Sequence, residues 1–285
     1  MSSDKIRPKM LLKIFLNLLF LLIFLLNNHN AESGENVRYV NSSSKKKLII
    51  IRDDEWRNID NGADFKSIRL KRSDTGFDII IKFLRMDLTV IEARVLYSKN
   101  PETNFQNVKN IAEKDNIIAA INGSFFDMNG NPLGLLIADS KTINNRVVTH
   151  SIYSGIFYVK DDVPFIVYRD NFTPVGVTQA LQVGPILIAD GKDTEGFKDI
   201  HSIHYRSGIA IDNAGRVIIY ATDTNYKGIS LYEIRHIMRL PDISCVNVLN
   251  LDGGGSTQMY ISTPSFSDYI AGNTDIPVAI GFYRR

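Results

Sequence analysis

Short runs rich in β-branched and aromatic residues recur along this chain from Leu48 to Ile261, and they constrain its fold more than any other feature. Such runs favour strands because branched side chains pack well on a pleated, half-buried surface. The expected strands are Leu48–Arg52, Phe77–Leu84, Leu88–Tyr97, Ile117–Ile121, Gly155–Lys160, Pro164–Tyr168, Leu181–Ala189, Gly208–Asp212, Arg216–Thr222, Val246–Leu251 and Thr257–Ile261. Many strands and few helices predict an α+β domain, in which a large mixed β-sheet system is flanked by a few helices.

Two segments carry the start signal of a helix. Thr103 with Gln106, and Ser230 with Glu233, each match the capping box, in which side chains and backbone N–H groups satisfy one another at the first turn. The second helix is expected to end before Pro241, because proline cannot continue a helix. Each helix leads into an expected strand, and each of these strands ends in a polar motif that contains glycine.

Composition and charge indicate one globular domain after the N-terminal segment. The 285 residues are 44% hydrophobic and 22% charged, and neither a repeat nor a low-complexity break interrupts residues 48–285. The net charge of +2 comes from the start of the chain, because residues 1–31 alone carry +3 and leave −1 for the rest. No basic field of the kind that binds nucleic acid remains, so nucleic acid is not an expected partner.

The first 31 residues have the three parts of an export signal. Basic residues, Lys5, Arg7 and Lys9, lead into the apolar run Ile14–Leu26. A polar stretch then extends to Ala31, which is the expected residue before cleavage. The apolar run is shorter than the roughly 20 residues that span a bilayer comfortably, and this favours a cleaved signal over a membrane helix.

An uncleaved anchor that includes residues 10–26 is the alternative, because His29 suits poorly the position two before the cleavage site. Residues 32–47, which follow this segment, are expected to form a polar tether.

The single cysteine, Cys245, excludes an internal disulfide, and an exported chain without disulfides suits a bacterial envelope. We therefore expect an exported protein of the periplasm or the extracellular space, which contacts the membrane only through its N-terminal segment if that segment stays uncleaved.

The strongest local motif is the segment from Asn250 to Thr257, where an apolar strand leads into Asp252, three glycines and two hydroxyl residues. Glycines let the backbone turn sharply and bring successive N–H groups toward an anion. The N–H groups of residues 253–256 are therefore candidates for an anion-binding nest, with the Asp252 carboxylate beside the bound group. A flexible turn that Asp252 merely caps is the alternative, although a hairpin turn needs fewer glycines.

A second motif, Asn122-Gly123-Ser124-Phe125, follows another expected strand. An amide offers both a donor and an acceptor to a sugar or a phosphate, and an aromatic face can cover a sugar ring. The alternative is a tight Asn-Gly turn followed by core phenylalanines.

A third motif places Arg206 directly before the expected strand Gly208–Asp212, where its guanidinium could bind a phosphate. His201 and His204 lie nearby, and His204 is a candidate proton carrier. A surface arginine with two solvated histidines is the alternative. In Val183-Gly184-Pro185-Ile186, Gly184 marks a close approach of two backbones.

Several other site types find no support in the sequence. A metal site is not indicated, because the chain has one cysteine and no third ligand accompanies the two histidines at helical spacing. Ser256 lacks the Gly-x-Ser-x-Gly context of a hydrolase nucleophile, and the three glycines lack the Gly-Lys-Ser/Thr end of a phosphate loop. We expect no cofactor, although a divalent cation stays open.

Taken together and in order, these motifs resemble the phosphodiester glycosidase family over most of residues 48–285. The landmarks are Asn122-Gly123-Ser124-Phe125-Phe126, Gly134, Val183-Gly184-Pro185-Ile186, Asp190-Gly191, Arg206-Ser207-Gly208-Ile209-Ala210-Ile211 and Leu251-Asp252-Gly253-Gly254-Gly255-Ser256. This chain departs from the usual pattern at Ser124 and Ala210, where the family more often has glycine, and at Gly208, where it more often has alanine.

The resemblance implies a hydrolase that cleaves the bond between the anomeric carbon of a sugar and a phosphodiester. It implies catalytic roles for Asp252, as nucleophile or base, for Arg206, on the phosphate, and for His204, as proton carrier. The residues it implies for substrate binding are Asn122, Gly123, Ser124, Phe125, Gly184, Gly253, Gly254, Gly255 and Ser256. The expected partner is a sugar phosphodiester or a phosphorylated glycan.

Two other functions fit the same residues. A non-catalytic envelope protein could bind phosphorylated glycans through this pocket without turning them over. An exopolysaccharide-processing or assembly factor would instead have another envelope protein as its partner. Turnover of a sugar phosphodiester separates the enzyme from both alternatives.

Overall fold

The computed structural model describes residues 39–40, 48–98, 105–114 and 117–285. The chain divides into two units, Met1–Arg38 and Tyr39–Arg285, of which only the second is described. The expected signal segment and most of the expected tether therefore lie outside the described residues. Strand β1 (Tyr39–Val40) pairs with β2 (Leu48–Asp53), so the second unit begins before the expected start at Leu48. No helix in the described ranges is both long enough and apolar enough to cross a bilayer.

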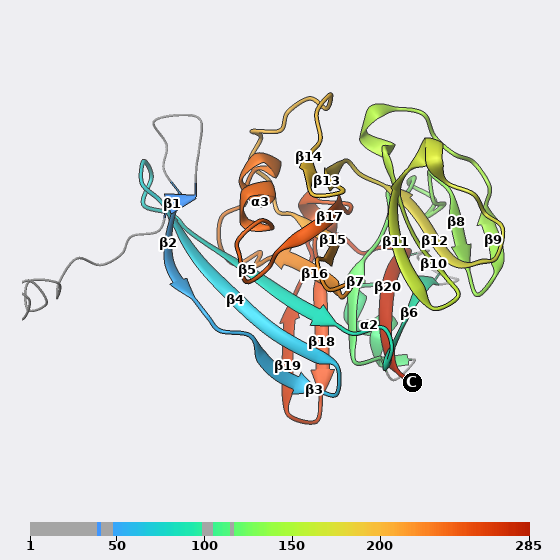
Figure 1. Cartoon of the computed structure of the whole chain (residues 1–285), viewed down its shortest axis with the longest axis horizontal. Coiled ribbons are helices and arrows are strands. Elements are labelled where there is room, and N and C mark those ends of the chain that lie inside the picture. Colours follow the sequence, from blue (N-terminus) through green and yellow to red (C-terminus); the bar gives the residue numbers. More distant parts are fainter. Residues whose placement is uncertain (1–38, 41–47, 99–104, 115–116) are drawn as a thin grey trace, which may run out of the picture. The chain divides into compact units, whose positions relative to one another are not determined.

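The described strands form three sheets (Figure 1). The largest has the order β1-β2-β4-β5-β16-β15-β17-β13-β14, with β3 paired to β4. Its further members are β3 (Arg57–Asp60), β4 (Ala63–Arg72), β5 (Asp78–Met86), β13 (Ile186–Ala189), β14 (Lys192–Asp193), β15 (Ser207–Asp212), β16 (Val217–Thr222) and β17 (Cys245–Asn250).

The other two sheets have five strands each, in the orders β11-β10-β12-β8-β9 and β19-β18-β7-β20-β6. The first contains β8 (Leu136–Ala138), β9 (Lys141–Asn144), β10 (Gly155–Lys160), β11 (Val163–Tyr168) and β12 (Val177–Val183). The second contains β6 (Ile91–Tyr97), β7 (Ala119–Asn122), β18 (Met259–Thr263), β19 (Phe266–Ile270) and β20 (Val278–Arg284).

The pairings differ from the mixed sheet system that the sequence suggested. Every strand pair in the described residues is antiparallel, including pairs between strands far apart in the chain, such as β5 with β16 and β7 with β20. Helices are few and short in the described ranges, where the α-helices are α2 (Val108–Lys114) and α3 (Leu231–Ile237). Strands thus dominate the described part of the chain more strongly than the label α+β implies.

One of the two predicted capping boxes begins a helix in the structure. The box of Ser230 and Glu233 is confirmed, because both reciprocal hydrogen bonds are present at the start of α3. Thr103 lies outside the described residues. Gln106 does not cap α2; it forms an isolated antiparallel bridge with Ile276, and its amide donates to Ser98.

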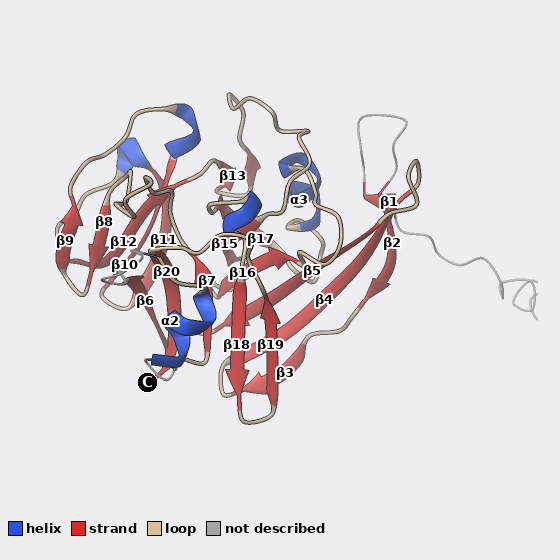
Figure 2. Ribbon diagram, turned by 180° about the vertical axis from the view of Figure 1, so that it is seen from behind, coloured by secondary structure: helices blue, strands red, loops and turns tan. Residues whose placement is uncertain are grey.

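One hydrophobic core joins the three sheets. Leu84 of β5, Val183 of β12 and Ile280 of β20 are fully or almost fully buried in the same cluster. A second cluster packs α3 onto the largest sheet, and a third packs α2 beside β7 and β18 (Figure 2). Burial of such side chains stabilises each layer by about 1.5 to 3 kcal/mol per large apolar residue.

Two interruptions of the expected strands matter for the site. The run Leu181–Ala189 divides into β12 and β13, which belong to different sheets, and Gly184-Pro185 lies between them. Proline has no N–H for the ladder, so the chain leaves one sheet and enters another there. Strands β4 and β20 were not expected from the sequence, although they are among the longest.

Candidate active site

Antiparallel pairing brings the Arg206 and Asp252 motifs to the same end of two adjacent interior strands, β15 and β17. In the register of β15 and β17, Gly208 lies opposite Asn250, so Arg206, directly before β15, and Asp252, two positions after β17, are brought close together. The N–H of Leu251 donates to the carbonyl of Ser207 at 2.9 Å, which extends the ladder up to the site.

A pocket of about 320 Å³ opens at this end of the two strands, and we call it the Arg206 pocket. Its lining residues are Phe125, Ile152, Gly184, Pro185, Phe197, Lys198, Asp199, Ser202, His204, Arg206, Leu231, Asn250, Asp252, Gly253 and Gly254. All three predicted catalytic residues lie in it. Of the predicted substrate-binding residues, Phe125, Gly184, Gly253 and Gly254 line it, whereas Asn122, Gly123, Ser124, Gly255 and Ser256 do not.

Arg206 is held by carbonyl groups and has no acid beside it. Its Nη2 donates to the carbonyl of Ser202 at 2.8 Å and its Nε to that of Ile229 at 3.3 Å. A Cβ built on Gly253 would lie 3.9 Å from Nη1, so the third nitrogen faces the glycine turn. Burial lowers the pKa of this guanidinium, and within the described residues no carboxylate pairs with it. A mostly buried cation without a counter-ion favours an anion in the pocket.

Asp252 has the opposite charge to Arg206, and within the described residues no cation pairs with its carboxyl group. Burial raises its pKa to about 6, and interactions with the Ser256 hydroxyl and the Gly253 N–H oppose this only in part. No arginine or lysine contributes to the shift, although Arg206 lines the same pocket. The two groups thus share a pocket without neutralising each other, which is typical of groups that act on a ligand.

The backbone of Asp252 is fixed from two sides, and this is where Asn122 acts. The Asn122 side chain donates to the Asp252 carbonyl at 2.6 Å and accepts from the N–H of Gln258 at 3.2 Å. The Ser207 hydroxyl donates to the same Asp252 carbonyl at 2.9 Å. The Asn122 amide is fully buried, both its nitrogen and its oxygen bond within the protein, and it does not line the pocket. The sequence suggested that Asn122 orients the substrate; in the structure its side chain instead contacts the backbone of Asp252.

Gly123 and Ser124 also lie behind the pocket. The Gly123 carbonyl accepts from the N–H of Asp252 at 3.1 Å, and its own N–H donates to Val278 at 2.8 Å. A side chain at Gly123 would collide with Val278, so the glycine allows β20 to approach. Ser124 is 2% exposed, and its hydroxyl has no hydrogen-bond partner in the described residues. Neither residue reaches the ligand space in this geometry.

The glycine turn is not the open nest that the sequence suggested. The N–H of Gly254 donates to the carbonyl of Tyr205 at 2.9 Å, and that of Ser256 donates to Gly253 at 3.2 Å within a single 3-10 turn, η3 (Gly254–Ser256). Gly255 packs against Thr274 instead of lining the pocket. Gly254 has a φ of +59° and open space beside it, so glycine is required there for the turn itself. The turn mainly places Asp252 and leaves room at Arg206.

Two segments of the pocket were missed from the sequence. The loop that contains Phe197, Lys198 and Asp199 forms part of the rim, and His204 lies at its end as an exposed residue. Ile152 comes from the 3-10 turn η1 (Ser151–Tyr153), and the adjacent Tyr153 feels the charge of Asp252. Neither segment has apolar periodicity or a glycine motif, so no local signal marked them.

Gly184 explains how the η1 segment reaches the pocket. A Cβ at Gly184 would lie 2.6 Å from the carbonyl oxygen of Ile152. The Ser154 hydroxyl also accepts from the N–H of Ile186 at 2.9 Å. The close approach predicted for this glycine is confirmed.

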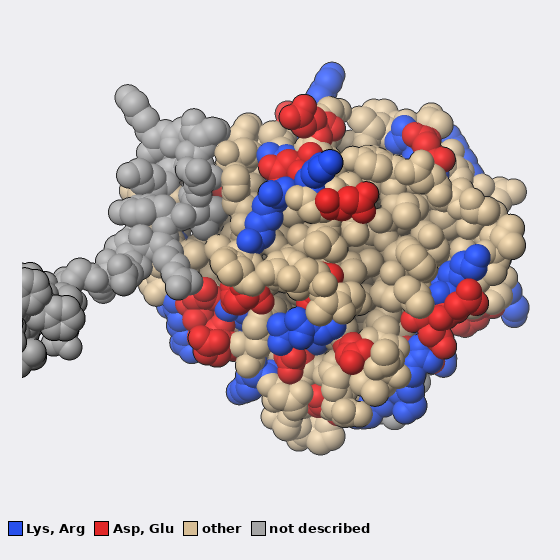
Figure 3. All heavy atoms as spheres, viewed as in Figure 1, with Lys and Arg blue, Asp and Glu red and all other residues tan. Residues whose placement is uncertain are grey.

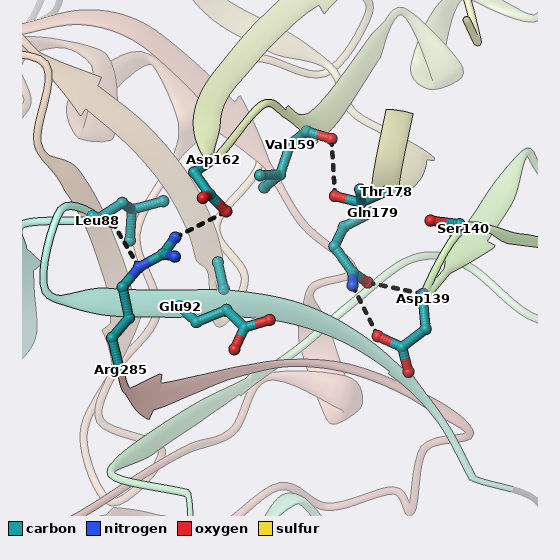
Figure 4. A pocket seen from close by; sticks show the side chains of 10 residues that line it. Leu88, Glu92, Asp139, Ser140, Val159, Asp162, Thr178, Gln179 and Arg285 are labelled. Atoms are coloured by element: carbon teal, nitrogen blue, oxygen red, sulfur yellow. Dashed lines mark hydrogen bonds and ion pairs between the residues drawn. The ribbon is translucent and has the colours of Figure 1, made fainter. Parts of the chain in front are cut away.

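A second pocket, of about 270 Å³, lies elsewhere on the described unit, and we call it the Arg285 pocket (Figure 4). Its lining residues are Leu88, Glu92, Ala93, Asp139, Ser140, Val159, Asp162, Thr178, Gln179 and Arg285. Its charges are paired: Arg285 with Asp162 at 2.9 Å, Glu92 with Arg94 at 2.8 Å, and Asp139 with the amide of Gln179 at 2.9 Å.

Charge elsewhere on the surface is mixed. Figure 3 shows Lys and Arg interspersed with Asp and Glu over the face in view, and neither sign forms a continuous field on the described part of that face. Among the described residues, no three or more His, Cys, Asp or Glu side chains are grouped so as to hold a metal ion. Cys245 is buried and free, and burial raises the pKa of its thiol.

Comparison with known proteins identifies the family. The model of the phosphodiester glycosidase family matches residues 115–283, which include the Asn122, Arg206 and Asp252 motifs. The chain belongs to the phosphodiester glycosidase family. Within this family it is similar to the N-acetylglucosamine-1-phosphodiester alpha-N-acetylglucosaminidases of Homo sapiens (27% identical over 169 residues) and Mus musculus (25% over 167 residues). Each match covers 50% of this chain, and the chain spans only about a third of those relatives (32% and 31%).

Solved structures support the fold of this phosphodiester glycosidase family member. The catalytic domain of the zebrafish N-acetylglucosamine-1-phosphodiester alpha-N-acetylglucosaminidase, auto-inhibited by its pro-peptide, matches with a TM-score of 0.62 at 17% identity, covering 86% of this chain and 90% of that one. A hypothetical protein from Synechocystis matches with a TM-score of 0.61 at 17% identity, covering 81% and 64%. At such identities the likeness establishes the fold alone.

Proposed function

We propose that this protein hydrolyses a sugar-1-phosphodiester in the Arg206 pocket. The observation that carries the proposal is the pair of unneutralised groups there: a mostly buried guanidinium without an acid and a mostly buried carboxyl without a cation. A substrate that joins an anionic phosphodiester to a sugar supplies a partner for each of them. Family membership supports glycosidase activity on phosphodiesters at the level of the reaction class.

Arg206 binds the phosphodiester in this proposal. Two of its nitrogens are anchored on carbonyls, so the group is oriented before the anion arrives, and Nη1 is left for the ligand. Departure of the leaving group breaks the bond between the anomeric carbon and the ester oxygen, and negative charge grows on the phosphate. A preorganised cation stabilises that charge more than it stabilises the ground state.

Asp252 acts on the sugar side. Its pKa of about 6 keeps it mostly ionised at neutral pH, where the carboxylate stabilises positive charge at the anomeric carbon. It then either attacks that carbon or removes a proton from the attacking water. A good leaving group makes a second carboxyl less necessary than in ordinary glycosides. The configuration of the released sugar, read by NMR, distinguishes retention from inversion.

His204 has a lesser role as proton carrier. It lies in the pocket on the same segment as Arg206, and its backbone is bridged to Ile229, which also holds the Arg206 guanidinium. From this position the imidazole can exchange a proton with solvent during the reaction.

The test is hydrolysis of the methyl phosphodiester of N-acetylglucosamine 1-phosphate by the purified full-length chain. Phosphodiesters of other sugars are assayed in parallel, because N-acetylglucosamine is the sugar named for the relatives and the sugar of this protein is not established. We expect turnover that falls by about 100-fold or more in Asp252→Asn and Arg206→Met. Equal activity in all three proteins contradicts the proposed roles. Binding that depends on Arg206 but is not followed by turnover on any of the sugars indicates a glycan-binding protein instead.

We also propose that the reaction takes place outside the cytoplasm. The proposal depends on the basic, apolar and polar succession of residues 1–31. Fractionation of cells that produce the full-length chain tests it. Protein in the periplasm, the medium or the membrane fraction is the expected result, and protein confined to the cytoplasm contradicts it.

A further inference from the structure

A buried ion pair joins β4 to the first turn of α3. The Arg72 guanidinium donates to both oxygens of the Glu233 carboxylate, from Nη1 at 2.7 Å and from Nη2 at 2.9 Å. Arg72 is 7% exposed and Glu233 is 6% exposed. Neither of them lines the Arg206 pocket or the Arg285 pocket. The pair therefore contacts no ligand in either pocket, and any effect on the reaction has to pass through other residues.

The peptide unit between Ile229 and Ser230 connects this pair to Arg206. Its N–H, which belongs to Ser230, donates to Oε2 of Glu233 at 2.9 Å. Its C=O, which belongs to Ile229, accepts from Nε of Arg206 at 3.3 Å. Because a peptide unit is planar, holding the direction of its N–H also holds the direction of its C=O. Arg72, Glu233, this peptide unit and Arg206 thus form one continuous chain of hydrogen bonds.

Close packing leaves this peptide unit little freedom. A Cβ at Gly228 would lie 2.4 Å from the backbone of His204, so a side chain there would collide. The N–H of Ile229 donates to the carbonyl of His204 at 2.8 Å. On the other side, the carbonyl of Gly228 accepts from Nη2 of Arg72 at 3.4 Å. Residues 228–230 are therefore held between the ion pair and the segment that carries Arg206.

Stability alone does not explain the pair of Arg72 and Glu233. Burial of two charges costs desolvation, which their attraction offsets only when every hydrogen bond is made. The Nε of Arg72 is buried and has no hydrogen-bond partner in the part of the chain that the structure describes. Burial raises the pKa of Glu233, but hydrogen bonds from Arg72 and Ser230 outweigh this and lower it, so the group is ionised. A carboxylate on the N–H polarises the peptide unit, which strengthens the bond from its C=O to Arg206.

We propose that Arg72 and Glu233 are positioning residues for Arg206, whose guanidinium they orient through the peptide unit between Ile229 and Ser230. The inference rests on the proposed function, because it takes Arg206 to bind the phosphate. A guanidinium oriented in advance loses little freedom when an anion binds, and a small error in its direction lowers the rate of the reaction.

The test removes both charges at once, because a single substitution to an apolar residue would leave the other charge buried and unpaired. The full-length Arg72→Met/Glu233→Leu variant is compared with the wild type. Three quantities are measured: the Kd of inorganic phosphate by isothermal titration, kcat/KM on a sugar-1-phosphodiester, and the solvent-exchange rate of the Arg206 Nε–H by NMR, assigned with Arg206→Met. We expect a folded variant whose phosphate affinity and kcat/KM fall by about 10-fold. The Nε–H should exchange faster, because its bond to the Ile229 carbonyl is loosened.

Arg85→Met/Asp64→Leu is the matched control. Nη2 of Arg85 donates to Asp64 at 2.8 Å, in a pair between β5 and β4 that lines neither pocket. This change should alter none of the three quantities. Arg72→Lys keeps a cation opposite Glu233 but loses the two-pronged contact, so it should shift all three in the same direction by less. It provides the test if the double variant at Arg72 and Glu233 does not fold.

The positioning role is overturned if a folded double variant, or Arg72→Lys, shows the phosphate Kd and the Nε–H exchange rate of the wild type. Equal losses in the control would also overturn it, since the effect would then follow from any lost ion pair of β4. Arg206→Met separates the two proposals. Phosphate binding that survives it contradicts the proposed function, whereas the exchange rate still reports whether the pair orients Arg206.

Discussion

The two pockets of this protein differ in how their charges are balanced. In the Arg285 pocket each charged group finds a partner within the protein, as Arg285 does with Asp162 (Figure 4). In the Arg206 pocket, Arg206 rests on carbonyls, and among the described residues no cation pairs with Asp252. Paired charges satisfy the folded protein, whereas unpaired buried charges cost stability that only a ligand recovers. The difference indicates which pocket is built for chemistry.

The largest expected effect compares the two arginines directly. Arg206→Met should lower kcat/KM on a sugar-1-phosphodiester by about 100-fold or more, because it removes the cation on the leaving phosphate. Arg285→Met, the matched change in the other pocket, should leave kcat/KM unchanged. Steady-state kinetics on both variants measures the contrast. A similar loss in both would show that the two pockets do not differ in the way we describe.

Asp252 sharpens the comparison through its pH dependence. Burial raises its pKa from 3.8 to about 6, so the folded state favours the protonated form. Stability from this group is full below pH 3.8 and is lost as the pH rises through about 6. The loss amounts to about 3 kcal/mol at higher pH. Asp252→Asn, which cannot ionise, should therefore gain stability relative to the wild type between pH 4 and pH 8.

Denaturant unfolding of both proteins at pH 4 and at pH 8 measures this gain in the free energy of unfolding. Asp162→Asn in the Arg285 pocket is the control: arginine lowers the pKa of Asp162 instead of raising it, and because the Asp162 side chain is mostly exposed, this variant should stay parallel to the wild type across the range. A wild type and an Asp252→Asn variant whose stabilities stay parallel across this range would contradict the burial that we assign to Asp252.

Asn122 tests whether positioning matters in the Arg206 pocket. Asn122→Asp keeps an acceptor for Gln258 but cannot donate to the Asp252 carbonyl when ionised. We expect a loss of about 1 to 3 kcal/mol in stability, as for a buried group left unsatisfied. Activity should fall roughly 10-fold, less than for Asp252→Asn, because a positioning contact is lost and not the reacting group. Full activity with a normal melting temperature would contradict the positioning role that we assign to Asn122.

The smallest expected effect belongs to the Arg285 pocket. The Asp162 side chain is mostly exposed, so its ion pair with Arg285 is screened by solvent. Asp162→Asn should leave the melting temperature at pH 7 and the kcat/KM unchanged within error. A clear loss of activity in this variant would mean that the second pocket also serves the reaction.

Much of the site could be predicted from the sequence because its chemistry lies at strand ends. Arg206 and Asp252 each adjoin an apolar run, and the antiparallel register of β15 and β17 brings the two residues together. The role of Asn122 could not be predicted in this way, since its partner carbonyl at Asp252 is 130 positions away in the chain. Ile152 was missed because a single-turn segment without periodicity carries it.

The fold shows the same division between local and long-range information. Apolar runs located most strands, but β4 alternates charged and apolar residues and resembles a solvated surface. Its Lys66 is 2% exposed, because it pairs with Asp53 and with Asp242 from a distant loop. Partners so far apart in the chain leave no local pattern.

The most direct test of the central claim is a ¹³C NMR titration of the Asp252 carboxyl, assigned with Asp252→Asn, in the presence and absence of inorganic phosphate. Our account predicts a pKa of about 6 for the free protein. It also predicts a further rise when phosphate binds beside it, because a second negative charge in the pocket disfavours ionisation. In Arg206→Met that rise should vanish. A pKa near 4, or a pKa that ignores phosphate in the wild type, would contradict the claim that Arg206 and Asp252 serve one anionic ligand.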